Sequence, residues 1–153
     1  EIISKISWGQ KQIIDCSLLY ILAIETDINA VLVRYQKLQI DIRKINQKEA
    51  AEYSEFVKKF LVNKSSDGGF YEPWTTRQLY LAMGFFISIA AFLGIDTAPI
   101  EGFDEDKLNG LFNLKKYNLS SKVLLCIGKR SVLDEYPKLA KIRKSKSDLV
   151  VNI

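Results

Sequence analysis

The chain has 153 residues, of which 48% are apolar and only three are proline, so we expect a single domain over residues 1–153 that buries a core. The sequence contains no histidine, which excludes the common zinc clusters, Ser-His-Asp triads and Cys-His nucleophile pairs. We therefore expect no metal site, and any catalysis has to be carried by another group.

Charge is spread unevenly along the sequence. The net charge is +4, but residues 115–146 contain ten Lys and Arg residues against Asp134 and Glu135, a local balance of +8 that leaves −4 for the remainder. A basic C-terminal third predicts an anion site or a surface for an acidic partner. For most of these lysines, a solvated face is the simpler interpretation.

The two cysteines, Cys16 and Cys126, are far apart in the sequence, and each lies in an apolar run. A thiol in such a run behaves as a small hydrophobic group. The first residues show no secretory signal of the basic-then-apolar kind. We expect a cytoplasmic protein with two buried free thiols, rather than a disulfide or a metal site.

The first predicted element is a strand over residues 17–24, an apolar run that is short and rich in β-formers. We expect it to be a central strand, buried on both faces. After a charged stretch, apolar residues recur at three- and four-residue spacing, which predicts an amphipathic helix; they are Ala50, Tyr53, Phe56, Val57, Phe60 and Leu61. Glycine and small polar residues over 63–69 predict a loop.

A second helix is predicted from an N-cap at Thr75 or Thr76 to a left-handed C-cap at Gly94. It carries no charge from residue 78 to 95 and is apolar all round, so a membrane span has to be considered. Polar residues within it and acidic residues just beyond it favour burial in the core or in a subunit interface. We expect no membrane association.

The last third of the chain predicts three elements. Asp104 caps a short helix that runs through Asn109, and residues 122–127 form a second buried strand that ends at Gly128. Residues 148–153 predict a terminal strand. Such a strand needs a sheet edge to join, in its own subunit or in another.

Residues 98–103, between the second helix and the short one, read Ala-Pro-Ile-Glu-Gly-Phe. Proline restricts the backbone just before the glycine, and the glycine has no side chain, so backbone N–H groups here can face a planar ligand at close range. Taken alone, the segment is more simply interpreted as an ordinary loop between two helices.

The order of these segments resembles the nitroreductase family, and most closely its oxygen-insensitive nitroreductases and dihydropteridine reductases. The resemblance rests on residues 77–84 (RQLYLAMG), 91–96 (AFLGID) and 99–104 (PIEGFD), and it covers nearly the whole chain apart from a divergent middle at 34–71. It implies an α+β fold with a central, mostly antiparallel sheet flanked by helices. It also implies a homodimer, with the long apolar helix in the interface and the C-terminal strand exchanged between subunits.

The resemblance further implies FMN as the cofactor. Glu101 and Gly102 would lie beside the flavin N5 atom, with Pro99 and Ile100 packing on the ring. Gln12 would lie near the pyrimidine edge of the flavin. These assignments follow from matching positions in the family motif.

Lys141 and Arg143 match the basic pair that contacts the FMN phosphate in the family. Two residues apart on an extended chain, their side chains fall on one side, so both can reach one phosphate, and arginine adds a planar fork for bidentate contact. Phe60 or Leu61 would approach the substrate side of the ring. For either residue, a core position on an amphipathic helix is the simpler interpretation.

The resemblance implies an FMN-dependent NAD(P)H oxidoreductase that passes hydride through flavin N5 to nitroaromatic, quinone or pteridine-like acceptors. No catalytic side chain is required beyond a polarising role of Glu101, and we expect no nucleic-acid partner. The family's N-terminal arginine-serine phosphate motif and its Ser/Asn-rich loop are absent from this sequence, so we expect an N-terminally incomplete domain. The alternative is a truncated, flavin-free homologue that acts as a dimeric binding or structural protein.

Overall fold

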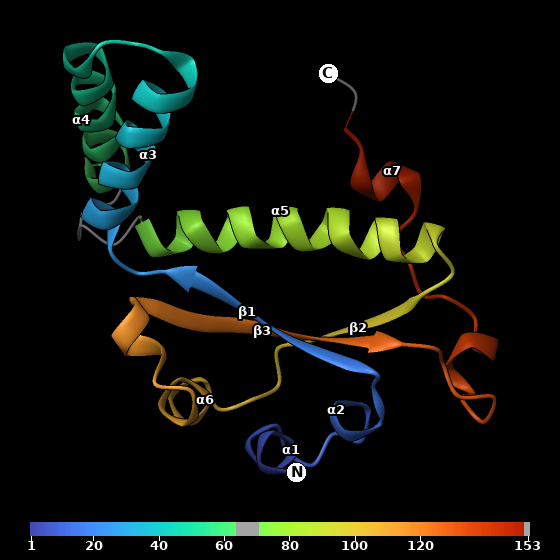
Figure 1. Ribbon diagram of the computed structural model, residues 1–153. Coiled ribbons are helices and arrows are strands. Elements are labelled where there is room, and N and C mark those ends of the chain that lie inside the picture. The colour runs from blue at the N-terminus through green and yellow to red at the C-terminus, as the bar shows by residue number, and fades with distance from the viewer. Residues whose placement is uncertain (64–70, 152–153) are drawn as a thin grey trace.

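The computed structural model describes residues 1–63 and 71–151 (Figure 1). Within these ranges, three strands form an antiparallel sheet in the order β1-β3-β2. The strands are β1 (Leu18–Glu25), β2 (Asp96–Ile100) and β3 (Leu119–Gly128). The protein is therefore of the α+β class, as predicted.

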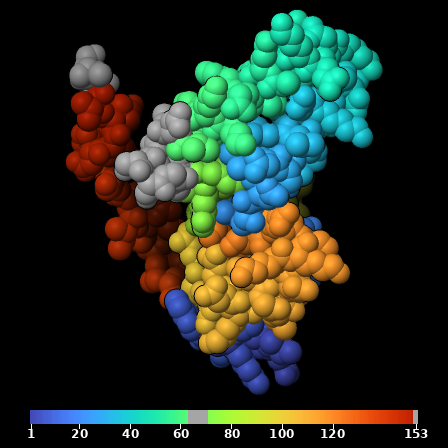
Figure 2. Space-filling view, turned by 90° about the vertical axis from the view of Figure 1, so that its left-hand side faces the viewer, coloured from blue at the N-terminus to red at the C-terminus, as the bar shows by residue number. Residues whose placement is uncertain are grey.

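Helices cover both faces of the sheet (Figure 1). The long helix α5 (Tyr71–Phe92) lies along one face, whereas α1 (Ile2–Ile6), α2 (Gln12–Asp15) and α6 (Glu105–Leu111) lie on the other. The helices α3 (Ile28–Arg43) and α4 (Gln47–Asn63) form a hairpin that projects from the sheet and its covering helices (Figure 2). The predicted helix around residues 50–61 is confirmed as α4, while residues 64–69 of the predicted loop lie outside the described ranges.

The core is built around β3. Its residues from Val123 to Ile127 are all buried, because β3 is paired on both edges and covered on both faces. Leu108 of α6 and Ile100 of β2 complete this core from the α6 side. Full burial of one such aliphatic side chain contributes roughly 1.5–3 kcal/mol. The buried strand predicted over residues 122–127 is confirmed, and it begins slightly earlier, at Leu119.

One ion-pair cluster ties β3 to helices of both faces. The Lys122 ammonium lies 2.6 Å from Glu72 in the first turn of α5 and 2.8 Å from Glu105 in the first turn of α6. Carboxylates at helix N-termini also interact favourably with the helix dipole. The Lys122 cluster therefore fixes the starts of α5 and α6 relative to the central strand.

The strand predicted over residues 17–24 exists as β1, but the prediction of a central position is wrong. In the described part of the chain, β1 pairs only with β3 and forms one edge of the sheet. Leu18 and Tyr20 are exposed as a result. An apolar run alone does not distinguish a central strand from an edge strand that leaves some of its apolar side chains exposed.

The long apolar helix begins earlier than predicted. Thr75 does not cap its N-terminus: α5 starts at Tyr71, and the Thr75 hydroxyl donates to the carbonyls of Tyr71 and Glu72, at 3.0 and 2.9 Å. Pro73 fits the first turn, where a missing N–H costs nothing. The predicted left-handed end is confirmed, because Gly94 has φ +70°.

Most of the apolar surface of α5 faces outward. Ala90 is its one buried residue, whereas Leu81, Phe85, Ile89 and Phe92 are between 59% and 91% exposed. The described residues therefore do not bury this helix in a core, and the subunit-interface alternative stays a prediction. Among the residues described, none of the helices combines the length and the hydropathy that a membrane span requires.

Three local predictions differ from the structure. The charged stretch before α4 contains α3, which Asp27 caps by accepting from the amides of Asn29 and Ala30. Residues 98–100, the first part of the segment 98–103 that was interpreted as a loop, lie in the edge strand β2. The strand expected from residue 148 is wrong for its described residues: Asp148 and Leu149 lie in the short helix α7 (Lys146–Leu149), and residues 150–151 are in no strand. Residues 152–153 of that expected strand lie outside the described ranges.

The physical reason for α7 is local. The Ser145 side chain accepts from the Asp148 amide and the Asp148 side chain accepts from the Ser145 amide, which completes a capping box. The segment also lies away from the sheet (Figures 1 and 2), and among the described residues it pairs with neither edge strand. The short helix Glu105–Leu111 starts as predicted, since Asp104 accepts from the Lys107 amide at 3.1 Å.

Candidate functional site

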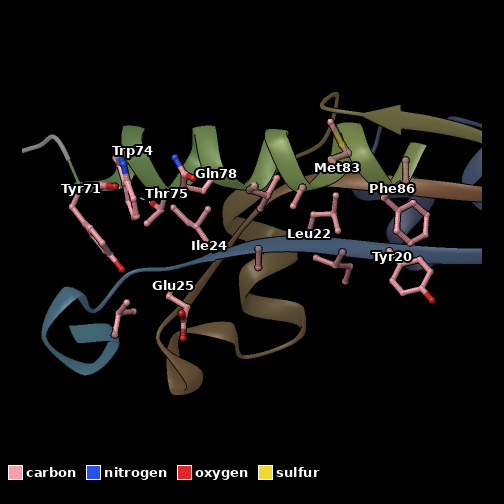
Figure 3. Close-up of a pocket in the computed structure, with 16 residues that line it drawn as sticks. Tyr20, Leu22, Ile24, Glu25, Tyr71, Trp74, Thr75, Gln78, Met83 and Phe86 are labelled. Carbon is pink, nitrogen blue, oxygen red and sulfur yellow. Dashed lines mark hydrogen bonds between the residues drawn. The ribbon is translucent and has the colours of Figure 1, made fainter. Parts of the chain in front are cut away.

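Two cavities border the sheet. The larger, of 620 Å³, lies between α5 and β1 and is lined mostly by apolar side chains (Figure 3). Its aromatic end is formed by Tyr20 and Phe86, whose rings meet edge to face at 5.8 Å. None of the site residues predicted from the sequence lines this cavity. It is a gap between two layers of the fold, with Gln78 and Glu25 as its main polar groups.

The second cavity, of 370 Å³, lies where β2 begins and β3 ends, and we refer to it as the β2–β3 cavity. Its walls are the end of α2, the first three residues of β2, the end of β3 and the segment 129–141 that follows. Two predicted cofactor-binding residues, Gln12 and Lys141, meet here from opposite ends of the chain. The structure thus brings together residues that the sequence could not connect by spacing.

Charges of both signs line the β2–β3 cavity. Arg130 is paired with Asp96, to which its Nε donates at 2.8 Å and its backbone amide at 3.0 Å. The Arg130 guanidinium and amide hold the pKa of the Asp96 carboxyl below its usual range. This pair joins the first residue of β2 to the chain just after β3. Lys129 and Lys141 supply two further cations, opposed by the carboxylates of Asp15 and Asp134.

The predicted segment Pro99–Gly102 continues from β2 away from this cavity. Pro99 is exposed on the edge strand, which is where a strand tolerates a residue without an N–H. The Ile100 side chain is 4% exposed and packs in the core with Leu108.

Gly102 is packed against an indole. A Cβ atom at this position would lie 2.7 Å from Cζ3 of Trp8, closer than real Cβ contacts, so only glycine fits without a shift. Its carbonyl accepts from the Gln10 side-chain amide at 2.8 Å. Trp8 itself has φ +56° and is 76% exposed. A largely exposed indole on a left-handed backbone is uncommon for a bulky residue and marks this contact as a feature of the site.

Glu101 is held by the long helix. The Tyr80 hydroxyl donates to the Glu101 carboxylate across from α5, and this hydrogen bond raises the pKa of Tyr80 to about 12. The bond fixes the direction of the Glu101 side chain, which is otherwise exposed. Tyr80 lies within the segment 77–84 that carries the family resemblance, and its hydroxyl in the uncharged part of α5 is the signal in the sequence that points to it.

Two predicted residues lie elsewhere. Arg143 is exposed, and its guanidinium donates to the neighbouring Ile142 carbonyl at 2.9 Å rather than lining the β2–β3 cavity. Phe60 lines a separate aromatic cavity of 490 Å³ between α3, α4 and α5. The other aromatic residues around that cavity are Tyr35, Tyr53, Phe56, Tyr71 and Trp74.

Comparisons with known proteins find similarity to nitroreductases. A protein from Staphylococcus epidermidis, provisionally named an NAD(P)H nitroreductase, is 27% identical over 94% of this chain and 67% of its own length. The oxygen-insensitive NAD(P)H nitroreductase of Salmonella typhimurium is 40% identical over 46% of this chain, but the match spans only 32% of that protein. The chain thus spans between a third and two thirds of these relatives. No protein-family model matches it.

Solved structures agree on the fold. A provisionally named nitroreductase from Bacillus subtilis superposes with a TM-score of 0.81 at 20% identity, covering 99% of this chain and 70% of the other. A second, from Exiguobacterium sibiricum and crystallised in complex with FMN, has a TM-score of 0.77 at 16% identity, covering 99% and 70%. The chain has the nitroreductase-like fold, and the proteins it resembles in sequence and structure are nitroreductase family proteins.

Proposed function

We propose that this chain forms one wall of an FMN site at the β2–β3 cavity and acts as an NAD(P)H-dependent oxidoreductase of the nitroreductase type. Its acceptors would be nitroaromatic, quinone or pteridine-like compounds. The observation that carries the proposal is the convergence of Gln12 and Lys141 on one cavity beside β2, the strand that leads into Pro99–Gly102. The FMN complex of a protein with the same fold supports it.

The residues at this cavity fit the cofactor in size and in donor chemistry. A volume of 370 Å³ falls within the range of about 300–1,000 Å³ typical of ligand pockets. Lys141 and Lys129 supply cations for a phosphate, and the Gln12 amide can both donate and accept at the edge of a heterocycle. The carboxylates of Asp15 and Asp134 repel the FMN phosphate, so we expect the affinity for FMN to depend on Lys141 and Lys129.

When bound, FMN supplies hydride transfer at its N5 atom, and the chain supplies binding and orientation. The backbone from Pro99 to Gly102 would lie along the ring, in a conformation that Trp8 and Gln10 hold by packing on Gly102. The Tyr80 hydroxyl holds the Glu101 carboxylate in one direction. No side chain of this wall is required to exchange a proton, which agrees with the absence of histidine from the sequence.

The exposed face of α5 is proposed as the homodimer interface. Leu81, Phe85, Ile89 and Phe92 form an apolar stripe along most of the helix and are all more than half exposed. Large exposed apolar patches of this kind mark interaction surfaces in soluble proteins. Phe60 is proposed to lie on the acceptor side of the flavin, because it lines an aromatic cavity suited to a planar compound.

The decisive experiment is a titration of the purified protein with FMN, followed by flavin absorbance and fluorescence. We expect binding by the wild-type chain and weaker binding by Lys141→Ala. A hydrogen bond to a charged group contributes about 1.5–3 kcal/mol, which corresponds to a roughly 10- to 100-fold increase in Kd. Lys138→Ala is the matched control, because Lys138 lies on the same segment but pairs with Glu135 outside the cavity.

Two results would refute the proposal. A wild-type protein that stays colourless in excess FMN would leave the flavin-free, dimeric binding or structural protein as the better description. Equal losses for Lys141→Ala and Lys138→Ala would mean that FMN is attracted by the general basic charge of residues 115–146 and not by this cavity.

A further inference from the structure

The fold brings the two cysteines to one cavity. Cys16 directly follows α2, and Cys126 lies near the end of the central strand β3. Both line the β2–β3 cavity, and Cys16 packs against the buried cluster that contains Cys126. Both thiols are free in the structure; Cys126 is buried as predicted, whereas the prediction of a buried Cys16 is wrong because this residue is only half-buried.

The two thiols differ in accessibility. Cys126 is 4% exposed, and burial together with the neighbouring Cys16 raises the pKa of its thiol to about 12. Cys16 is only half-buried at the wall of the cavity, and its thiol donates weakly to the Ile13 carbonyl at 3.6 Å. A reagent entering the cavity therefore meets Cys16 first. Cys126 is the less accessible of the two thiols.

This arrangement is the one expected of a redox-sensitive pair, in which an accessible cysteine reacts and an adjacent one resolves the product. We propose that Cys16 and Cys126 are a peroxide-oxidised modification site, which forms a reversible disulfide across the floor of the β2–β3 cavity. The proposal does not depend on FMN binding. In reducing compartments, disulfides of this kind are typically transient and redox-sensing.

The oxidation is written in two steps. The Cys16 sulfur, as thiolate, attacks one oxygen of a hydroperoxide; the O–O bond breaks, a Cys16 sulfenic acid forms, and the remaining oxygen leaves with a proton as the alcohol or water. The Cys126 sulfur then attacks the Cys16 sulfur, so the S–S bond forms and the S–O bond breaks. The departing hydroxide takes the Cys126 proton and leaves as water. Two electrons pass from the sulfurs to the peroxide.

The crosslink would have a defined structural effect. Cys16 is the residue on which α2 ends, with its amide donating to the Gln12 carbonyl at 3.0 Å. Joining Cys16 to β3 therefore ties the end of α2, and with it the Gln12 wall of the cavity, to the most buried strand of the sheet. The reduced protein holds the same wall by noncovalent packing alone.

The test is thiol labelling after treatment of the intact protein with increasing hydrogen peroxide. The samples are quenched in denaturant with a maleimide, and their mass is measured. We expect the wild-type chain to lose both labels together, to lose the mass of two hydrogen atoms, and to recover both labels with dithiothreitol. In Cys16→Ser, Cys126 should keep its label at the same peroxide dose. In Cys126→Ala, Cys16 should accumulate as a sulfenic acid that dimedone traps.

Other outcomes overturn the proposal. If Cys16 of the wild-type protein gains oxygen while Cys126 stays fully labelled, the two thiols do not exchange and the pair is structural. If the labels are lost together only in disulfide-linked dimers, the bond joins two chains and not the two walls of one cavity. If Cys126→Ala fails to fold, the wild-type mass and the Cys16→Ser labelling still decide the question.

Discussion

Replacing Gly102 by alanine tests whether the close packing of the Trp8 indole on Gly102 contributes to the stability of the folded protein. The new Cβ would lie 2.7 Å from Cζ3 and 3.0 Å from Cε3 of the indole, and 3.2 Å from the Gln10 amide nitrogen. The atoms met first are at the far end of a side chain that is 76% exposed, so the indole can swing outward. We therefore expect a loss of unfolding free energy near the lower end of the overpacking range, about 1 kcal/mol.

The assay combines chemical denaturation with fluorescence. In a Trp74→Phe background, Trp8 is the one remaining tryptophan, and its emission should shift to the red in Gly102→Ala because the ring moves into water. Gly110→Ala is the matched control: no atom lies within 4 Å of its added Cβ, and it lies inside α6. There, alanine should stabilise the protein by roughly 0.5–1 kcal/mol.

The reasoning is refuted if Gly102→Ala leaves both the Trp8 emission and the denaturation midpoint unchanged. A further check is the pair Trp8→Ala with Gly102→Ala. Because removing the indole removes the clash, the alanine at position 102 should cost much less in the Trp8→Ala protein. Additive losses would mean that the loop itself, rather than the indole, resists the substitution.

Three further predictions address the site and the surface. Arg130 lowers the pKa of Asp96 in the folded protein. The stability that Asp96 contributes is therefore present above its unfolded pKa of about 3.9 and is lost as the pH falls through the folded value. The wild-type protein should be more stable than Asp96→Asn at pH 7, and the difference in stability should disappear as the pH is lowered in a series of denaturation experiments. Arg143→Ala should weaken FMN binding less than Lys141→Ala, since only the lysine lines the cavity; equal effects would show that the segment rearranges on binding. Phe85→Asp should yield a folded monomer in sedimentation experiments, and an unaltered dimer would exclude the α5 face as the interface.

Much of the fold follows from local signals in the sequence. The apolar run ending at Gly128, the cap at Asp104 and the left-handed Gly94 all predict the element or boundary that the structure has. The misses have physical causes. Charged residues around Asp27 obscure the apolar periodicity of α3. Pro99 argues against a strand because proline is tolerated mainly in edge strands, and the sequence does not reveal that β2 is an edge strand.

The site was less accessible to sequence reasoning. Gln12, Lys141 and the segment Pro99–Gly102 were selected by resemblance, and only the fold reveals that the first two line one cavity. Spacing gives no reason to connect residues at opposite ends of a chain. The same limitation applies to Cys16 and Cys126, which look like two independent core thiols until β3 and the end of α2 are placed together.

The order of the sheet has a consequence for how the protein folds. In the described part of the chain, β1 and β2 pair only with β3, which comes last of the three in the sequence. Among the described strands, pairing can therefore form during synthesis only once β3, from Leu119 onward, leaves the ribosome. Until then the nascent chain can form only helical contacts, such as the α3–α4 hairpin. Pairing of β1 with β3 closes a loop of long sequence separation, which predicts slow sheet formation and an exposed, aggregation-prone β1 in the meantime.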